Sequence, residues 1–149
     1  MKYFDIKSLE HLEHQEAMEK WRLMTDKYHD YFETISGNFS KSYLDTYNKN
    51  DHFHDFNLVN INCHYKKWND LQISLIVNFR DERKYDIIHS NVKKCEVNLP
   101  FCENFLIWLY DEYEYDHQNK LWIHRIVFTD YNEISITSKN IIAKKSKNM

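Results

Sequence analysis

The sequence predicts an α+β fold in which N-terminal helices pack on one face of a mainly antiparallel sheet of about six strands. Two observations predict this fold. Apolar residues recur every three or four positions in the first third of the chain and every second position after it, and the change falls just past residue 50. The strand-like segments then follow one another without intervening helices, which is the order typical of α+β proteins.

Two helices are expected within residues 1–50. Ser8 can cap the first, which should begin near residue 9 and end near Ser36, because Gly37 offers the left-handed conformation that closes many helices. Ser40 can cap the second, from about residue 41 to residue 47. An acidic strip is expected along the first helix, formed by Glu10, Glu13, Glu16 and Glu19.

About six strands are expected in residues 51–143. They are predicted at residues 59–65, 71–79, 85–99, 105–115, 121–128 and 134–136, with a last edge at 141–142. The third should kink near Asn91 and stop at Pro100, which cannot donate a ladder hydrogen bond. With residues 144–149 as a frayed basic tail, we predict a single domain over residues 1–149.

The composition limits the classes of function. Lys and Arg number 20 against 23 Asp and Glu, and the net charge of -3 disfavours wholesale binding to nucleic-acid phosphates. A single glycine excludes a glycine-rich nucleotide cradle. Because no apolar run has the length of a signal peptide or a membrane helix, we expect a cytoplasmic protein without a membrane partner.

The three cysteines are expected to be reduced thiols, because Cys63, Cys95 and Cys102 include no Cys-x-x-Cys pair. Cys63 and Cys95 also fall in phase with apolar neighbours on predicted strands. We therefore expect both to be buried and to behave as small hydrophobic residues.

The run from Asp51 to Asp55 is the first candidate site. His52, His54 and Asp55 are ligand types that zinc and iron require, so a small metal-dependent hydrolase using this cluster, with His124 as a further group, is the alternative function. The interpretation that we favour is structural: His54 or Asp55 hydrogen-bonds backbone groups where helix gives way to sheet. On that interpretation the chain holds no metal and no cofactor.

A second candidate lies on the strand predicted at 105–115. Glu112, Glu114 and Asp116 share one face of it and Asp111 lies on the other, so carboxylates could gather near His124 on a neighbouring strand. The simpler interpretation pairs them with Lys or Arg across the sheet. Glu112, Glu114 and His124 are assigned to an interaction surface.

Five segments carry a family resemblance. They are Met1-Lys2-Tyr3-Phe4, residues 28–47, Phe53-His54-Asp55, Leu109-Tyr110-Asp111-Glu112 and His124-Arg125-Ile126-Val127-Phe128. Together they resemble a group of uncharacterised bacterial proteins in which a Leu-His-Asp-Ala or Leu-His-Asp-Ser motif links a helical part to an antiparallel sheet. Here Phe53 replaces the Leu and Phe56 the small residue. Similar proteins occur beside toxin genes, so the resemblance implies an immunity or interaction role.

We therefore expect a non-enzymatic module that binds another protein, with a toxin as one candidate, through the open sheet face or the acidic strip. No Ser or Cys sits in the glycine-flanked turn that a nucleophilic enzyme of the hydrolase type requires. An exposed terminal strand could also pair with a second copy and form a homodimer.

Overall fold

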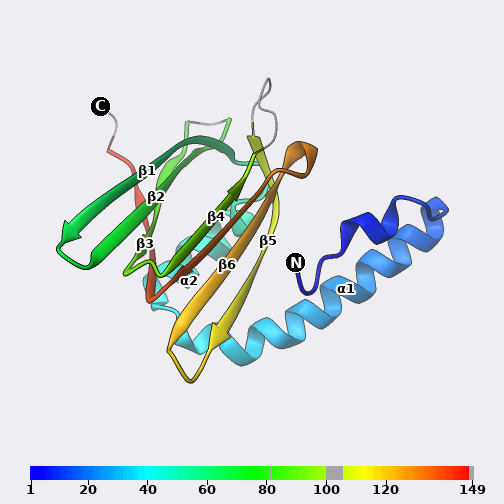
Figure 1. The fold of residues 1–149 in the computed structure, drawn as a ribbon. Coiled ribbons are helices and arrows are strands. Elements are labelled where there is room, and N and C mark those ends of the chain that lie inside the picture. Colours follow the sequence, from blue (N-terminus) through cyan, green and yellow to red (C-terminus); the bar gives the residue numbers. More distant parts are fainter. Residues whose placement is uncertain (81, 100–105, 148–149) are drawn as a thin grey trace. The chain divides into compact units, whose positions relative to one another are not determined.

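Eight strands form one antiparallel sheet in the computed structural model, which describes residues 1–80, 82–99 and 106–147 (Figure 1). The α-helices are α1 (His14–Ile35) and α2 (Lys41–Lys49), and short 3-10 helices span Ile6–Leu9, Ser36–Asn38, Asp51–Phe53 and Thr129–Tyr131. The strands are β1 (Asn57–Lys67), β2 (Asp70–Asn78), β3 (Lys84–Ser90), β4 (Lys94–Asn98), β5 (Leu106–Asp116), β6 (Leu121–Phe128), β7 (Glu133–Ser138) and β8 (Asn140–Lys145). The α+β class with two N-terminal helices is confirmed, whereas the count of about six strands is too low.

The additional strands arise from a break and an extension. The strand predicted at 85–99 divides into β3 and β4, because Asn91 takes a left-handed φ of 52° and its N–H is bound by Asp70 Oδ1 at 2.8 Å. The kink is therefore where we expected it, while the predicted stop at Pro100 lies outside the described residues. The tail expected from residue 144 is not frayed at its start, because Lys145 pairs with Tyr85 in the β3–β8 ladder and the Ser146 N–H donates to the Lys84 carbonyl at 2.8 Å.

The chain divides into two compact units, residues 1–38 and residues 39–149. The single domain over residues 1–149 stays a prediction. In the first unit the N-terminal segment packs along α1 through aromatic rings. Tyr3 stacks on Tyr31 with ring centroids 5.0 Å apart, and Phe4 contacts Trp21 and Tyr28 at 5.2 Å each. These contacts define the apolar side of α1 within this unit.

The boundaries of α1 differ from the prediction. It begins at His14, because residues 6–9 form a separate 3-10 helix and the Ser8 hydroxyl donates to the Asp5 carbonyl instead of capping α1. The end at Ile35 agrees with the prediction, but Gly37 does not have a positive φ, and a 3-10 turn continues the helix. The predicted acidic strip is shorter, since two of its glutamates precede the helix.

In the second unit α2 packs on the sheet through one aromatic face. Ser40 caps it as predicted, accepting the Tyr43 N–H at 3.2 Å. Just before the cap, Phe39 stacks on Trp122 of β6 with 3.7 Å between ring centroids. Tyr43 and Tyr47 are both buried and meet the Tyr113 ring edge-on, so apolar contact with β5 and β6 positions α2.

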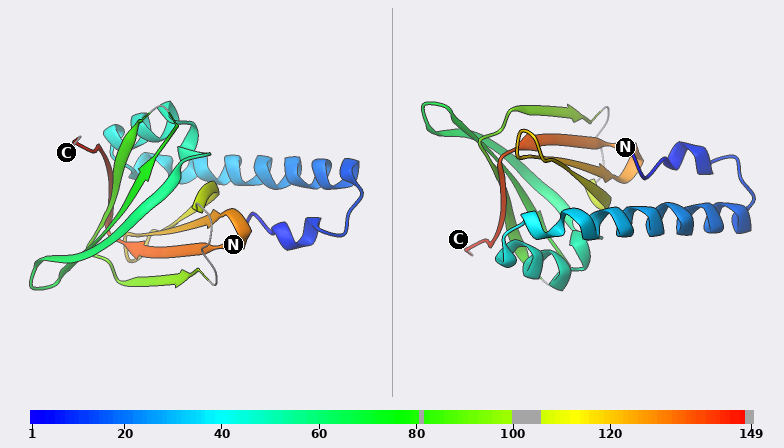
Figure 2. Two further views of the ribbon diagram at one scale, coloured as in Figure 1. Left: turned by 90° about the horizontal axis from the view of Figure 1, so that it is seen from above. Right: turned by 90° about the horizontal axis from the view of Figure 1, so that it is seen from below.

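The sheet runs in the order β4-β7-β6-β5-β1-β2-β3-β8 and consists of two halves. Only the first residues of β1 join them, through Asn57 opposite Ile107 and Leu58 opposite Leu106. The halves meet at an angle, as Figure 2 shows. Fully buried side chains of both halves form the core between them, including Phe53, Phe56, Ile73, Leu75, Ile87, Trp108, Ile126, Phe128, Ile134 and Ile136.

Candidate functional site

Six polar side chains form one buried cluster within the second unit. They are Tyr43 and Tyr47 from α2, His89 from β3, Asp111 and Tyr113 from β5, and His124 from β6. We call them the buried polar cluster. The inward positions of a sheet are normally apolar. A cluster of polar side chains at such positions therefore needs hydrogen-bond partners for its polar atoms.

A line of hydrogen bonds crosses the cluster from α2 to β3. The Tyr47 hydroxyl donates to Asp111 Oδ1 at 2.7 Å, and Asp111 Oδ2 lies 2.8 Å from His124 Nε2. The second nitrogen of that imidazole, His124 Nδ1, is hydrogen-bonded to His89 Nε2 at 3.0 Å. The line therefore ties the helix to both halves of the sheet.

A pair of tyrosines flanks this line. The Tyr43 and Tyr113 hydroxyls are hydrogen-bonded to each other, and burial raises the pKa of both phenols, so both are neutral. The Tyr113 ring also stacks on the His124 imidazole, with centroids 4.0 Å apart and planes at 17°. The stacking fixes the orientation of the ring through which the two halves of the sheet are linked.

Burial determines the charge of the cluster. It raises the pKa of Asp111 to about 7 and lowers the pKa of His124 well below its usual range. The pKa of His89 is lowered as well, first by burial and then by the neighbouring His124. We infer that the Asp111 carboxyl holds a proton at slightly acidic pH and donates it to His124 Nε2.

One polar atom of the cluster is unsatisfied. When the protonated Asp111 donates to His124 Nε2, the His124 Nδ1–H donates to His89 Nε2, and the other nitrogen of His89 carries the hydrogen of that ring. That atom, His89 Nδ1, has no hydrogen-bond partner among the described residues. His89 and His124 have no exposed surface and Asp111 is 5% exposed. In this conformation the cluster holds the fold together and does not reach a substrate.

The motif between helix and sheet has a structural position. His54 Nδ1 lies 3.3 Å from Asp55 Oδ1, and both side chains are exposed. The Asp55 N–H donates to the Trp108 carbonyl at 2.9 Å, and the Trp108 N–H donates to the Phe56 carbonyl at 2.8 Å. Backbone groups thus make the junction with β5, and a hydrogen bond from the side chain of His54 or Asp55 to the backbone stays a prediction.

The same junction connects the surface with the buried polar cluster. The exposed His52 ring stacks on Tyr47 with centroids 4.6 Å apart, so it does not share a site with His54 and Asp55. In residues 1–80, 82–99 and 106–147, no three His, Cys, Asp or Glu side chains lie close enough together to hold a metal ion. The arrangement therefore lends no support to the metal-dependent alternative.

Asp111 lies on one face of β5, and Glu112 and Glu114 lie on the other, as predicted. The burial of two of the residues that we assigned to an interaction surface does not agree with that assignment. Glu112 and His124 are fully buried and cannot contact a partner in this conformation. Arg125 lies 2.6 Å from a carboxylate oxygen of Glu114 and 3.5 Å from one of Glu112, which is the cross-strand pairing that we gave as the simpler interpretation. Asp111, on the opposite face, is the carboxylate that meets His124.

The end of the β1–β2 hairpin is the most exposed part of the second unit. Residues 62–69, which we call the hairpin tip, are all exposed, and beyond Leu58 the strand β1 pairs only with β2 within the described chain. Tyr65 is 71% exposed and Trp68 is 90% exposed. Figure 1 shows the tip projecting from the sheet at the left.

The cysteines differ from the prediction in their exposure. Cys63 and Cys95 are free thiols and both are exposed, while Cys102 lies outside the described residues. The prediction that both cysteines fall in phase with apolar neighbours was correct, because Cys63 lies opposite the buried Ile73 and Cys95 lies opposite the buried Ile136. They are exposed because β1 and β4 lie at the margins of the two halves, where no other strand of the described residues pairs with this part of them.

Several residues of this site were missed by reasoning from the sequence. Tyr47, His89 and Tyr113 were not among the candidate site residues. Asp111 at an inward strand position was the available signal, since a buried carboxyl requires donors nearby. Trp68 lies between two predicted strands, where a turn is expected to be exposed, and this position was the available signal for the hairpin tip.

None of the described helices is long and apolar enough to cross a membrane. The resemblance to uncharacterised bacterial proteins stays a prediction, and so does the immunity role that it implies. No known protein family matches the chain, and no curated protein matches it.

Proposed function

We propose that this chain is a non-enzymatic protein-binding module that recognises an acidic surface of another protein through the hairpin tip. The observation that carries the proposal is the exposure of Tyr65 and Trp68 beside Lys66 and Lys67 on a projecting hairpin. Tyrosine and tryptophan dominate the binding energy of many protein interfaces, since each buries a large area with few rotatable bonds.

The charge of the tip indicates the chemistry of the partner. No ion pair links Lys66 or Lys67 to another described residue, while the nearby Asp70 carboxylate accepts the Asn91 N–H at 2.8 Å. Both ammonium groups are therefore available to carboxylates of a partner at the rim of an interface. An acidic protein surface complements the tip in charge, and an apolar pocket in it would receive Trp68.

The limited packing of the hairpin tip also supports a partner. A two-stranded hairpin exposed on both faces has little apolar burial to stabilise it in water, and a partner would supply the missing contact. A toxin, the partner class implied by the family resemblance, is a narrower form of this proposal. It predicts co-purification with one acidic protein of the source cell.

Affinity capture with three variants tests the proposal. The double variants Tyr65→Ser/Trp68→Ser and Lys66→Glu/Lys67→Glu each alter one property of the tip, and Val97→Ser, at a half-exposed position of β4, is the matched control. We expect wild type and Val97→Ser to capture the same protein at near-stoichiometric amounts and both tip variants to lose it. Titration calorimetry of the purified pair should then show weaker binding at higher salt.

Two results would overturn the proposal. One is that wild type captures no protein near stoichiometry, and the other is that the tip variants retain it as the control does. A third result would assign the tip to a different macromolecule. In that case wild type captures no protein but binds anionic phospholipid vesicles or an oligonucleotide, and Tyr65→Ser/Trp68→Ser loses that binding.

A further inference from the structure

Two rows of facing residues bring the exposed cysteines toward each other. In the first row Cys63 of β1 lies opposite Ile73 of β2, and Ile73 lies opposite His89 of β3. Residues directly opposite in antiparallel strands point to the same face of the sheet. Because Ile73 and His89 are buried, Cys63 lies at the margin of the inward face of this half.

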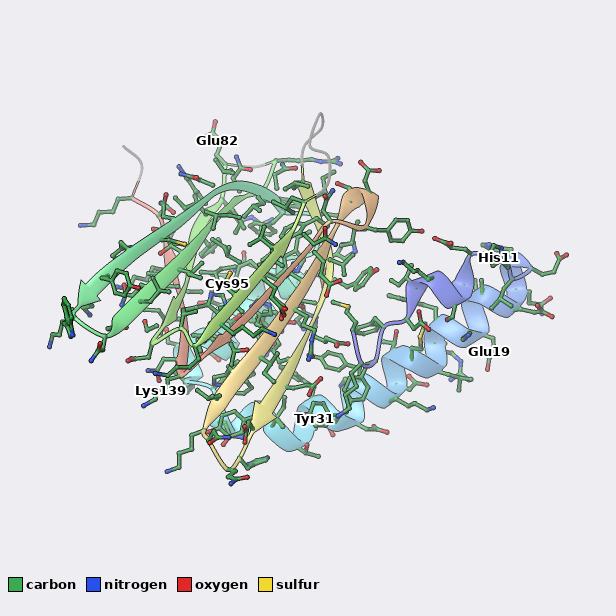
Figure 3. The ribbon with its side chains drawn as sticks, in the orientation of Figure 1. His11, Glu19, Tyr31, Glu82, Cys95 and Lys139 are labelled. Carbon is green, nitrogen blue, oxygen red and sulfur yellow. The ribbon has the colours of Figure 1, made fainter. Side chains whose placement is uncertain are left out.

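The second row has the same form in the other half of the sheet. Cys95 of β4 lies opposite Ile136 of β7, and Ile136 lies opposite His124 of β6. Ile136 and His124 are fully buried, so Cys95 is also at the margin of an inward face. Figure 3 labels Cys95 on this strand.

The two rows meet at their histidines, each of which lies two strands away from the cysteine of its row. The hydrogen bond of 3.0 Å between His89 and His124 places the inner ends of the rows in contact. Each thiol lies two strand spacings from that contact. Because β3 also contacts β7 and β6 also contacts β8, the two rows run in the same direction away from the histidines. Both rows therefore end on the same side of the core, with Cys63 on β1 and Cys95 on β4.

The segment before β4 supports this placement. The Val92 N–H donates to the Leu71 carbonyl of β2 at 3.0 Å, and the Lys93 N–H donates to the Thr137 carbonyl of β7 at 2.8 Å. The chain thus contacts both halves immediately before Cys95. Burial by its neighbours raises the pKa of the Cys95 thiol, and the nearby Cys63 is the next cause of that rise.

We propose that Cys63 and Cys95 are a modification site, at which a low-molecular-weight disulfide such as oxidised glutathione converts the two thiols into a reversible disulfide between β1 and β4. The thiolate of one cysteine attacks the small disulfide and releases one thiol, which leaves a mixed disulfide on the protein. The second cysteine attacks the protein sulfur of that bond and releases the second small thiol. Two protein thiols are oxidised and one small disulfide is reduced to two thiols.

The position of the site makes the bond compatible with the fold. Both thiols are accessible to a small oxidant. The margins that the bond would connect, β1 beyond residue 58 and β4, each pair with a single strand within the described chain, so no ladder hydrogen bond has to break. In a reducing cytosol such a bond forms transiently and reports an oxidised glutathione pool.

Mass spectrometry of the full chain tests the proposal. In the variant Cys102→Ser, oxidised glutathione should remove two hydrogen atoms and leave no glutathione adduct and no thiol that reacts with N-ethylmaleimide. Peptide mapping should identify a Cys63–Cys95 cross-link within one chain, and dithiothreitol should reverse it. The reaction should be faster for the folded chain than for the chain in urea, because the fold holds the thiols together.

The matched variants Cys63→Ser/Cys102→Ser and Cys95→Ser/Cys102→Ser keep one thiol each and should stop at the glutathione adduct, with unchanged circular dichroism. A Cys102→Ser chain that carries two adducts, that cross-links only between chains, or that reacts no faster folded than in urea would overturn the proposal. These outcomes do not depend on whether the hairpin tip binds a protein.

Discussion

Replacing Asp111 by asparagine should stabilise the protein more at alkaline pH than at acidic pH. The amide has the shape of the carboxyl group, so it can accept the Tyr47 hydroxyl hydrogen and donate to His124 Nε2. It imitates the protonated carboxyl at every pH. The variant therefore isolates the free-energy effect of ionising one buried group.

The magnitude follows from the pKa of Asp111, which burial raises from 3.8 to about 7. The folded chain retains a proton that the unfolded chain has released, so this contribution to stability is complete below about pH 4 and is lost as the pH rises through about 7. Between about pH 5 and about pH 8.5 the wild type should lose about 3 kcal/mol through this group, and Asp111→Asn should not.

Urea unfolding of both proteins at the two pH values measures the effect. We expect the variant to exceed wild type by about 1–2 kcal/mol near pH 5 and by about 4–5 kcal/mol near pH 8.5, a growth of about 3 kcal/mol. His89 and the titratable residues outside the cluster are present in both proteins. Their titration therefore contributes mainly to the pH dependence that the two proteins share. Asp45→Asn, at an exposed position of α2, controls for the loss of a negative charge as such.

A variant that is less stable than wild type by the same amount at both pH values would refute the reasoning. That result would mean that Asp111 is ionised and pairs with a protonated His124, because the amide would then remove a charge pair instead of imitating a neutral group. The neutral form of the buried polar cluster would have to be abandoned.

The remaining predictions concern the free energy of unfolding. Ser40→Ala removes the acceptor of the Tyr43 N–H and should lower it by about 1 kcal/mol, so an unchanged urea midpoint would contradict the role of the cap. Tyr43→Phe leaves the buried Tyr113 hydroxyl without this partner and should cost about 2 kcal/mol, whereas a neutral effect would show that the pair contributes no stability. In oxidised Cys102→Ser, the disulfide proposed above closes the loop from residue 63 to residue 95 and should add about 4 kcal/mol relative to the reduced protein; a lower midpoint after oxidation would indicate strain.

Periodicity predicted the element types well because each period determines which face can be buried. The alternation at residues 121–128 correctly predicted β6, an interior strand of the sheet, and Ser40 correctly predicted the start of α2. The number of strands was underestimated because one apolar alternation continues through Asn91, and the break there depends on a hydrogen bond that the Asn91 N–H donates to Asp70, 21 residues earlier. The sequence predicted a kink at Asn91, but a contact so distant along the chain leaves no local pattern that shows the strand to be broken.

The candidate site was harder to predict because alternation distinguishes two faces but does not say which polar residue lies inside. Glu112 and Asp111 are neighbours on opposite faces of β5, yet both are buried. Their hydrogen-bond partners decide their roles, and those partners come from α2 and β6. The exposure of Cys63 likewise depends on the order of strands in the sheet, because the same alternation would bury it in a central strand.

The low glycine content has a different consequence from the one expected. It excludes glycine-built loops, yet the described chain still makes tight left-handed turns, with positive φ at Asp51, His52, Phe53, Asp55, Glu82, Asn91, Lys120, Asp130 and Tyr131. A left-handed residue other than glycine costs about 1 kcal/mol, and more for a bulky side chain such as Phe53. That cost at the junction is offset by burial: Phe53 has no exposed surface and contacts the rings of Phe56, Tyr85 and Trp108. The motif that stands out in the sequence is therefore explained by a strained backbone that is anchored in an aromatic core.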